Sequence, residues 1–287
     1  MLTVKLLLAL GLLCPVQDTL QTQKQDSLLL MFWNLENFFD HRSENRPRYW
    51  TAGRLKAKCD AISKEIFRVA DRYGRYPEFL AFAEVENDHV LRRLVSDTPL
   101  RKLGYSIVHY ESPDHRGIDC ALLYRKNGRK LTVSEPKHIT DRNGVTVPTR
   151  DILMACFDTL AILVNHHPSQ IGGKTENRSL AMKRMNEVAD SLMGSGMRAV
   201  IAVGDFNADY WGGDGKTGTI KYNGAWEKID GHFKWGDVKT AEKIIDDPML
   251  LEQDKNYGGM KPRRTFNGPR YNNGISDHLP IVVTIYF

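Results

Sequence analysis

The chain has 287 residues, 41% of them hydrophobic and 26% charged, and a formal net charge of +5. A chain of this length can bury a large core, and no internal repeat, low-complexity tract or Pro/Gly/Ser-rich linker divides it, which argues against a repeat array. The mildly basic balance is compatible with a polyanionic partner but is also ordinary for a globular protein, so charge alone selects no function.

The N-terminal residues predict export. Lys5 is followed by the apolar residues 6–13 and then by the polar residues 17–26. The apolar stretch is too short to span a bilayer and has the layout of a secretory signal peptide. We therefore expect residues 1–25 to be a signal peptide with a short polar lead-in and residues 26–287 to form a single domain. The mature protein is then expected to be periplasmic or extracellular.

The cysteines leave two alternatives open. Lipid anchoring at Cys14 is one, but lipoprotein signals usually place a small residue just before the modified cysteine, whereas this chain has Leu13 there. The other cysteines are Cys59, Cys120 and Cys156, an odd number without a C-x-x-C pair, which argues against a structural zinc site. A disulfide between Cys120 and Cys156 is the second alternative, which the sequence does not decide.

The order of apolar runs along the chain predicts a mixed α/β protein. Residues 55–70 and 177–193 carry apolar side chains at spacings of three and four, which is typical of a helix with one buried stripe. Short apolar runs predict strands at residues 28–33, 79–83, 105–110, 120–124, 131–133, 152–157, 160–164, 199–203 and 281–287. Strands and helices of this size favour two sheets packed face to face with helices outside, although the strand order cannot be read from the sequence.

Five of the predicted strands have metal-binding or proton-transferring residues at one end. Four of them run into such residues, and the pair Asp277-His278 comes just before the last strand. If these strand ends meet, they form one mouth of carboxylates, amides and imidazoles. Such a set suits metal-assisted attack of water on a phosphate ester, because the cation and the donors neutralise charge on phosphorus while a base activates water. Each residue alone has an ordinary explanation as a turn residue or a surface charge.

The motifs that carry these residues occur in the order of a known family. They are Trp33-Asn34-Leu35-Glu36-Asn37, Glu84-Val85, Arg116-Gly117-Ile118-Asp119, Asn165-His166, Gly204-Asp205-Phe206-Asn207, Ile229-Asp230 and Ser276-Asp277-His278-Leu279-Pro280. Together they resemble the endonuclease/exonuclease/phosphatase family over roughly residues 28–287. The resemblance implies a fold of the α/β (α+β) class, a four-layer α/β sandwich of two mixed β-sheets packed face to face with helices on the outside. It also implies metal-dependent hydrolysis of phosphoric esters.

The resemblance further implies a metal site. Glu84 is the expected principal ligand of Mg²⁺, for which Mn²⁺ could substitute, because a hard cation prefers carboxylate oxygen and keeps several waters. Asn34 is expected to help the metal or a phosphate oxygen from the neighbouring strand, and Asp277 to make a second metal or water contact. Glu36 is included as a second-site metal ligand, at a position that varies across the family.

Four motif residues are implied to act on water and phosphate. Asp205 is expected to position or deprotonate the attacking water. Asn207 is expected to donate a hydrogen bond to the phosphoryl oxygen as its charge grows. His278, oriented by Asp230, is expected to bind the phosphate or to act as general base.

The leaving-group side is assigned to a second histidine. The resemblance implies that His166 is the general acid or a phosphate donor there, with Asp119 as its partner. His167 stands where many relatives carry tryptophan, and we expect it to be an ordinary packed or solvent-facing side chain.

Cationic and aromatic residues are mixed in the loops beside the predicted mouth. They lie within residues 42–54, 211–226 and 261–270. Cations for phosphates and flat rings for bases would make a nucleic-acid groove. Solvated surface loops anchored on the core by Trp50 and Trp226 explain them equally well.

Three functions remain open from the sequence. The first is an exported Mg²⁺-dependent endonuclease or phosphodiesterase acting on DNA or RNA. The second is a phosphoesterase for a phospholipid head group or a small phosphate ester. The third, a catalytically inactive binding module, is disfavoured because every required metal and proton-transfer position carries a suitable residue. No long apolar hairpin is predicted, so we expect no stable membrane insertion, and we expect a monomer.

Overall fold

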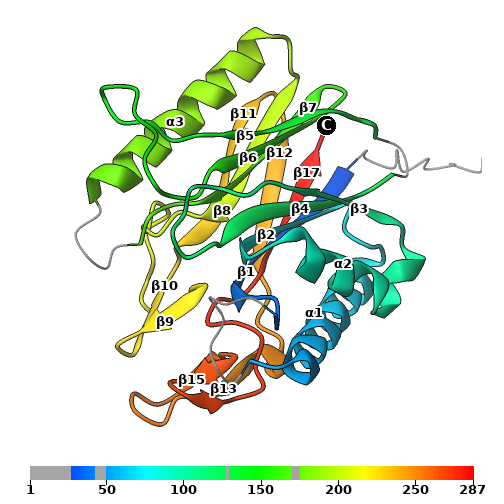
Figure 1. The fold of residues 1–287 in the computed structure, drawn as a ribbon. Helices are drawn as coiled ribbons and strands as arrows, with labels where there is room; N and C mark the ends of the chain where they lie inside the picture. Colours follow the sequence, from blue (N-terminus) through cyan, green and yellow to red (C-terminus); the bar gives the residue numbers. More distant parts are fainter. Residues whose placement is uncertain (1–26, 43–49, 127–128, 170–174) are drawn as a thin grey trace, which may run out of the picture.

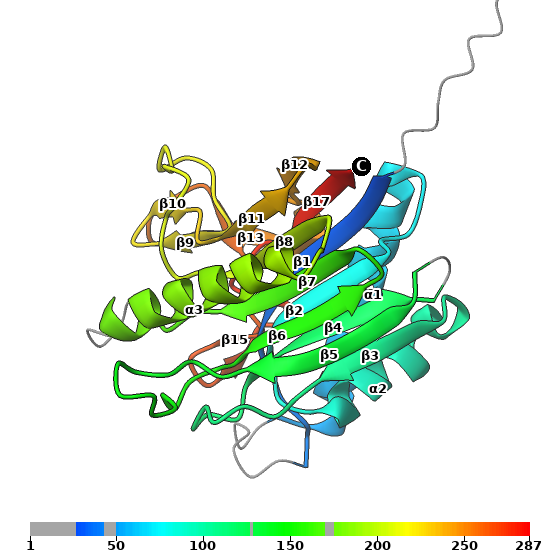
Figure 2. The ribbon, with the colours of Figure 1, turned by 90° about the horizontal axis from the view of Figure 1, so that it is seen from above.

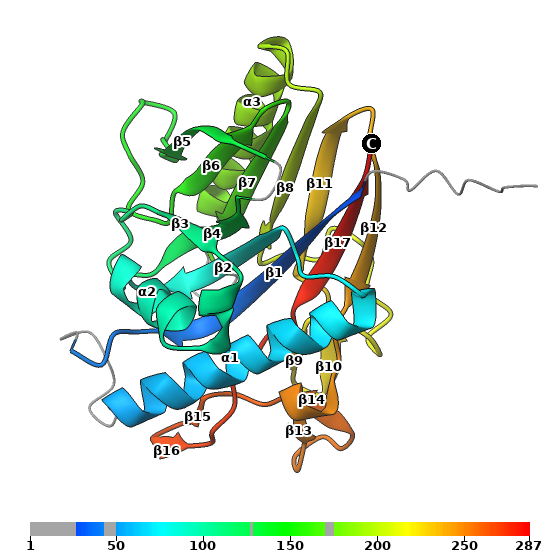
Figure 3. The same cartoon turned by 90° about the vertical axis from the view of Figure 1, so that its right-hand side faces the viewer.

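Two β-sheets packed face to face form the centre of the molecule (Figure 1). The structure is a computed structural model that describes residues 27–42, 50–126, 129–169 and 175–287. Helices lie on the outer faces of the sheets (Figure 3), so the layers run helix, sheet, sheet, helix. The expected four-layer sandwich is confirmed.

The larger sheet has six strands in the order β12-β17-β1-β2-β4-β3. Its strands are β1 (Ser27–Phe38), β2 (Phe79–Val85), β3 (Tyr105–His109), β4 (Asp119–Arg125), β12 (Lys239–Ile244) and β17 (Ile281–Tyr286). β1 runs parallel to β2 and antiparallel to β17. Strands from the two ends of the described chain therefore lie side by side (Figure 1).

The smaller sheet has five strands in the order β11-β8-β7-β6-β5. Its strands are β5 (Leu131–Lys137), β6 (Ile152–Phe157), β7 (Leu160–His166), β8 (Ala199–Asp205) and β11 (Asp230–Gly236). β7 and β8 are parallel, and the other neighbours are antiparallel. Every residue of β6, β7 and β8 is buried, as expected for strands covered on both faces.

The helices cover these sheets from outside (Figure 2). α1 (Ala52–Tyr73) and α2 (Asp88–Ser96) lie on the six-stranded sheet, and α3 (Thr175–Gly194) lies on the five-stranded sheet. The predicted stripe of the first helix is confirmed, since its members are at most 2% exposed: Leu55, Cys59, Ile62, Ile66 and Val69. In α3 only part of the predicted stripe is buried, because Leu180 and Leu192 stay half-buried.

Alternating side chains of β1 serve two different layers. Leu28, Leu30 and Phe32 face the other sheet, whereas Leu29, Met31 and Trp33 pack in the cluster that contains α1. Successive side chains of a strand point to opposite faces, so one apolar run can supply both. Between the sheets, the rings of Phe79 and Phe157 are 4.9 Å apart.

Short elements complete the fold. They are the strands β9 (Ile220–Tyr222), β10 (Ala225–Glu227), β13 (Leu251–Gln253), β14 (Met260–Pro262), β15 (Phe266–Asn267) and β16 (Arg270–Tyr271), and the 3₁₀ turns η1 (Pro99–Lys102) and η2 (Pro248–Leu250). Several of them lie beyond one end of the two sheets (Figure 1). The connecting segments there surround the mouth described below.

Three further expectations from the sequence concern membrane spans, the cysteines and the signal peptide. In the described part of the chain, no helix is long and apolar enough to cross a membrane. Cys59, Cys120 and Cys156 are free and buried, so the disulfide left open between the last two is not formed. The predicted signal peptide, and Cys14 with it, lies outside the described residues.

Candidate active site

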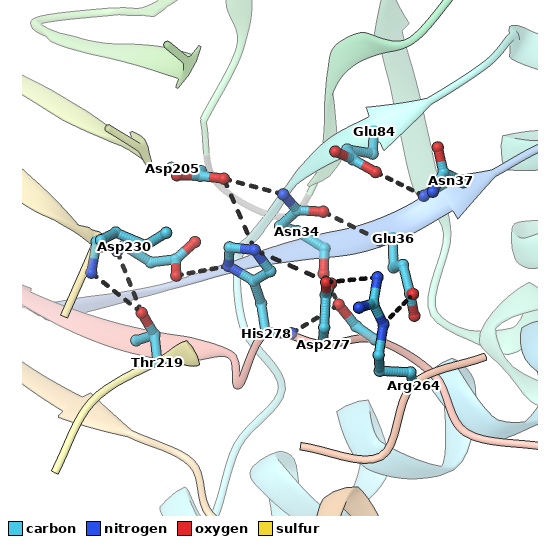
Figure 4. A network of polar contacts seen from close by, with 12 residues as sticks. Asn34, Glu36, Asn37, Glu84, Asp205, Thr219, Asp230, Arg264, Asp277 and His278 are labelled. Atoms are coloured by element: carbon cyan, nitrogen blue, oxygen red, sulfur yellow. Dashed lines mark hydrogen bonds and ion pairs between the residues drawn. The ribbon is translucent and has the colours of Figure 1, made fainter. Parts of the chain in front are cut away.

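Strand ends from both sheets meet at one end of the sandwich. β8 pairs with β7 and β11 so that His166, Asp205 and Asp230 stand opposite one another on neighbouring strands. From the other sheet, β1 contributes Asn34 and β2 contributes Glu84. Figure 4 shows side chains of both sheets grouped around one space. The convergence that the motifs predicted is therefore present.

Asp205 lies at the centre of this group. Its Oδ2 accepts a hydrogen bond from Asn34 Nδ2 at 3.0 Å. The same oxygen is 3.7 Å from His166 Nε2 and 3.9 Å from His278 Nε2. His166 Nε2 is in turn 3.9 Å from Glu84 Oε1. Five side chains that are far apart in the sequence thus form one connected cluster.

The backbone of this mouth is held in an unfavourable conformation at four residues. The φ angles of Glu36, Asn37, Glu84 and Asn207 are 46°, 53°, 61° and 50°, in a region that costs non-glycine residues energy. The backbone N–H of Asn37 donates to Glu84 Oε2 at 2.7 Å and so ties the end of β1 to that of β2. Such conformations persist only where the surrounding contacts hold them, and they concentrate at functional sites.

Gly204 sets the distance between β7 and β8 at the mouth. A Cβ at this position would lie 2.3 Å from the backbone oxygen of Asn165, far inside van der Waals contact. The Asn165 side chain donates to backbone oxygens of β7 and β8. The Gly204–Asn165 contact therefore belongs to the scaffold that keeps His166 next to Asp205.

His278 is oriented by a carboxylate. Its Nδ1 is 2.8 Å from Asp230 Oδ2, and both side chains are almost fully buried. The Thr219 hydroxyl accepts the backbone N–H of Asp230 and fixes that residue. Burial lowers the pKa of His278, but the charge and hydrogen bond of Asp230 outweigh it and place the pKa well above the ordinary value. The ring is therefore an imidazolium at neutral pH.

The pKa values of Asp205 and His166 are shifted in directions that suit proton transfer. Burial, and after it the charge of Asp230, raises the pKa of Asp205 to about 7. Burial, and after it the charge of Arg150, holds the pKa of His166 well below its usual range. Asp205 can therefore gain or lose a proton near neutral pH. His166 is a neutral imidazole that can donate through one nitrogen only.

Glu84 fits a hard metal ion best. Its Oε2 accepts the Asn37 N–H, whereas its Oε1 approaches Arg116 and His166 only at 3.7 Å and 3.9 Å, beyond hydrogen-bonding distance. The carboxylate is partly exposed, with 13% of the side chain accessible. An oxygen that is both accessible and without a strong donor can bind a cation.

Protein partners hold the oxygens of Asn34 and Glu36 and one oxygen of Asp277. Asn34 Oδ1 accepts the Glu36 N–H at 3.0 Å. Both Glu36 oxygens accept hydrogen bonds at 2.8 Å, one from Arg264 Nε and one from the backbone N–H that follows it. Arg264 also contacts Asp277 Oδ2 at 3.0 Å, and Figure 4 shows both carboxylates reaching this guanidinium. The geometry therefore favours Glu84 over Glu36 as the metal ligand, whereas Asp277, 23% exposed and with Oδ1 no nearer than 4.0 Å to His278 Nε2, keeps one oxygen for a second contact.

A second grouping of ligand atoms exists within the mouth. One ligand atom each of Asp205, Asp230 and His278 lies within 4.8 Å of the others, so the cluster could hold a metal ion. The hydrogen bond between His278 and Asp230 already uses one atom of each residue. The pair therefore fits an imidazole oriented by a carboxylate better than a metal site.

Asp119 is the predicted site residue that the structure places elsewhere. Its Oδ2 is 3.6 Å from His109 Nε2, and its Oδ1 accepts the Ser112 N–H at 2.9 Å. His166 Nδ1 is buried without a hydrogen-bond partner among the described residues. The expected pairing of Asp119 with His166 is not formed, because the pairing of β3 with β4 brings His109 to this carboxylate.

Asn207 contacts both Asp205 and His167. The Asn207 N–H donates to Asp205 Oδ1, and its Nδ2 donates to the His167 backbone oxygen, both at 2.9 Å. An amide nitrogen carries two hydrogens, so one remains for a phosphoryl oxygen. The His167 ring is buried edge-on against Phe206, and burial followed by Arg150 lowers its pKa to about 3. His167 is a packed side chain.

Two arginines without an assigned role from the sequence lie against the site. Arg150 is buried, donates to the backbone oxygens of His166 and His167, and pairs with Asp114 at 3.0 Å. Arg116 contacts Glu84 at 3.7 Å from a half-exposed position. Arg116 belongs to a motif that was already recognised, so that motif could have indicated its role. No sequence pattern marks Arg150.

The family model that matches the chain is described as the Endonuclease/Exonuclease/phosphatase family, and it matches residues 29–216 and 213–286. The chain belongs to the endonuclease/exonuclease/phosphatase family. Enzymes of this family are metal-dependent phosphoesterases that hydrolyse phosphoric esters, and the mouth around Asp205 is the candidate active site of this member. No curated protein matches the sequence.

Solved structures share the fold of this family member at low identity. TDP2 from Caenorhabditis elegans is 15% identical, with a TM-score of 0.58 over 91% of this chain and 75% of that one. The mannosyl-6-phosphatase of Bacteroides thetaiotaomicron is 17% identical, with a TM-score of 0.55 over 91% of this chain and 100% of that one. The catalytic domain of human Nocturnin is 18% identical, with a TM-score of 0.53 over 92% of this chain and 97% of that one.

Proposed function

We propose that this protein is an exported Mg²⁺-dependent phosphodiesterase that cleaves DNA or RNA by attack of an activated water molecule. The observation that carries the proposal is the position of Asp205, whose Oδ2 is 3.7 Å from His166 and 3.9 Å from His278. A carboxylate between two imidazoles, beside the accessible Glu84, provides a base, phosphate donors and a cation ligand in one mouth.

The charge state of Asp205, His278 and His166 determines the role of each in the proposed reaction. Asp205, with a pKa of about 7, accepts the proton of the attacking water, because a base is most effective when its pKa lies near the working pH. His278 is cationic beside Asp230 and donates a strong hydrogen bond to a phosphate oxygen. His166 is neutral and offers one N–H to another phosphate oxygen or to the leaving group.

Glu84 would hold Mg²⁺ through Oε1, the accessible oxygen without a strong donor. When bound, the ion neutralises charge that develops on the phosphate. Asn34 keeps Asp205 in place through their 3.0 Å hydrogen bond. Asn207 presents its remaining amide hydrogen beside the same carboxylate.

The surroundings of the mouth support a polynucleotide substrate. Arg116 and Arg264 are half-exposed and contact the carboxylates of the mouth. Arg264 lines a pocket of about 260 Å³ whose wall also includes the half-buried ring of Phe266 and the core side chain Trp50, which is 2% exposed. Cations that neutralise phosphates and ring faces that stack on bases are the two elements that single-stranded nucleic acids need.

A small phosphate ester is the second candidate substrate. The same pocket of about 260 Å³ is at the small end of ligand pockets and suits a single sugar or nucleoside better than a chain. A protein named mannosyl-6-phosphatase shares the fold over its whole length. In this alternative the chemistry at Asp205 is unchanged, and only the occupant of the pocket differs.

One panel of substrates separates the two candidates. Plasmid DNA, RNA, mannose 6-phosphate, sphingomyelin and bis-p-nitrophenyl phosphate are each incubated with Mg²⁺, with Mn²⁺ and with EDTA. The proposal predicts cleavage of DNA or RNA with Mg²⁺, none with EDTA, and a steep loss of rate as salt is added. Hydrolysis of mannose 6-phosphate alone would replace the nuclease by the small-ester candidate.

The arginines provide a sharper test of the nucleic-acid reading. Replacing Arg116 or Arg264 by Gln should reduce the slope of log rate against log salt by about one for each phosphate contact that is lost. Arg92, which is exposed on α2 and pairs with Asp88, provides the matched control as Arg92→Gln. An unchanged slope in both mouth variants would contradict a polynucleotide held at these cations.

The proposed location is outside the cytoplasm, with residues 26–287 acting as one domain and as a monomer. The support is the layout of Lys5 and the apolar residues 6–13, which is that of a signal peptide. Expression of the full chain in a secreting host, followed by mass spectrometry of the extracellular fraction, should yield a chain that lacks its first residues. Recovery of the uncleaved chain inside the cell would contradict export.

A further inference from the structure

A second cluster of ligand-type side chains lies at the end of the hairpin formed by β3 and β4. His109 is the last residue of β3 and pairs with Ala121 of β4. Asp119 opens β4 two residues before Ala121, and alternate residues of a strand point to the same face, so Asp119 lies on the same face of the hairpin as His109. Glu111 lies two residues beyond the end of β3, in the connection to β4. One ligand atom from each of these three residues lies within 4.8 Å of the others.

The two inner members of this cluster lack partners. His109 Nε2 and Asp119 Oδ2 are buried and have no hydrogen-bond partner in the part of the chain that the structure describes. Their side chains are 4% and 1% exposed. Buried polar atoms almost always have a partner, so an unpaired nitrogen and an unpaired oxygen aimed at each other require an explanation.

Their separation suits a shared cation. His109 Nε2 and Asp119 Oδ2 are 3.6 Å apart, which is too long for a hydrogen bond. Ligands on a tetrahedral zinc ion, with bonds of about 2.0–2.2 Å, stand about 3.4 Å apart. The other oxygen of Asp119 accepts the Ser112 N–H, as outer partners commonly orient ligating carboxylates.

We infer that His109, Glu111 and Asp119 bind a divalent transition-metal ion, with Zn²⁺ as the best fit, in a site separate from Glu84. The imidazole nitrogen favours a transition metal over Mg²⁺, which prefers an all-oxygen shell. Glu111 is exposed, so the ion can enter from solvent and keep a water as its fourth ligand.

The position of the site gives the ion a structural task. Asp119 pairs with Val85 in the ladder between β2 and β4, and Val85 directly follows Glu84. A bound ion would fasten the end of β3 and the segment around Glu111 to the strand beside the catalytic carboxylate. Metal binding should therefore raise the melting temperature of the protein.

The test uses metal-free protein carrying Glu84→Gln, which removes the proposed Mg²⁺ ligand and makes the result independent of catalysis. Calorimetric titration with ZnCl₂ and thermal unfolding with and without ZnCl₂ are measured. We expect one saturable zinc site and a melting temperature that rises by several degrees. Co²⁺ as a spectroscopic substitute should give visible absorption bands of a low-symmetry site.

Three variants in the Glu84→Gln background identify the ligands. Glu111→Gln removes an exposed ligand without touching the core, and His109→Gln removes the nitrogen ligand. His115→Gln, at an exposed histidine of the same connection, is the control. Zinc affinity should fall at least tenfold in the first two and stay unchanged in the control. Equal affinity in all three, or no saturable zinc binding, would overturn the inference and leave a plain histidine–carboxylate contact.

Discussion

Replacement of Asp230 by Asn is the most informative perturbation of the catalytic cluster. Asn has nearly the same shape, so its Oδ1 can still accept from His278 Nδ1, but the negative charge is lost. The pKa of His278 lies well above the ordinary value because Asp230 outweighs the effect of burial. Without that charge, burial lowers the pKa of His278 against only the charges of Asp205 and Asp277, so a smaller fraction of the imidazole is protonated at pH 7.

The size of the effect follows from the contact that is changed. The bond is 2.8 Å long between side chains that are 6% and 1% exposed, and charge-assisted hydrogen bonds of this kind contribute about 1.5–3 kcal/mol. Because about 1.4 kcal/mol corresponds to a factor of ten in rate, hydrolysis at pH 7 should slow about 10- to 150-fold. Because the charge of Asp230 also raises the pKa of Asp205, the variant keeps an ionised Asp205 to lower pH, and a lower pH should restore part of the rate by protonating His278 again.

The assay is the pH profile of initial rates on bis-p-nitrophenyl phosphate, with the melting temperature measured in parallel. Glu242→Gln is the matched control. Glu242 of β12 forms a similar carboxylate–histidine pair at 2.6 Å with His232, which lies on β11 like Asp230 but away from the mouth. The control should keep the wild-type rate and pH profile. A folded Asp230→Asn variant with the wild-type rate and profile would refute the reasoning.

Three further predictions follow from single contacts. Glu84→Gln should lower the Mg²⁺-dependent rate at least about 10²-fold and abolish protection of the fold by Mg²⁺ in thermal unfolding. Gly204→Ala should destabilise the protein by about 2 kcal/mol or more in urea unfolding, since its Cβ would lie 2.3 Å from the Asn165 oxygen. Burial, and after it Asp247, raises the pKa of Glu65 from 4.5 to about 8. Between pH 4.5 and pH 8 the Glu65 carboxyl group is therefore ionised in the unfolded state but still protonated in the folded state. The wild-type free energy of unfolding should therefore fall by up to about 4 kcal/mol from pH 4.5 to 8, and Glu65→Gln should remove this part of the decline.

Much of the fold could be predicted because apolar runs record burial directly. The run that became β1 is buried along nearly its whole length, and the stripe of α1 follows helical spacing. β12 was not predicted, because it is an edge strand in which residues such as Lys239 and Lys243 are exposed and only alternate positions are covered. α2 was not predicted either, although the Asn87 side chain caps this helix by accepting the Val90 N–H.

The sequence could predict which residues reach the candidate site but not which side chains contact each other there. Motif order identified Asp205, His166 and His278, because these residues end or precede buried strands. Which carboxylate meets which base depends on strand order, and no local pattern carries that information. Asp119 therefore contacts His109 and not His166. Glu36 met Arg264, a residue 228 positions further along the chain.

The central claim is that Asp205 activates water in a metal-dependent mouth. The most direct measurement is the rate of bis-p-nitrophenyl phosphate hydrolysis by metal-free protein as Mg²⁺ is added back, for the wild type and for Asp205→Asn. The account predicts that the wild-type rate returns with Mg²⁺, and that the variant, with an unchanged melting temperature, is slower by about 10²–10⁴-fold at every concentration. Equal rates for the two proteins, or a wild-type rate that does not depend on metal, would contradict it.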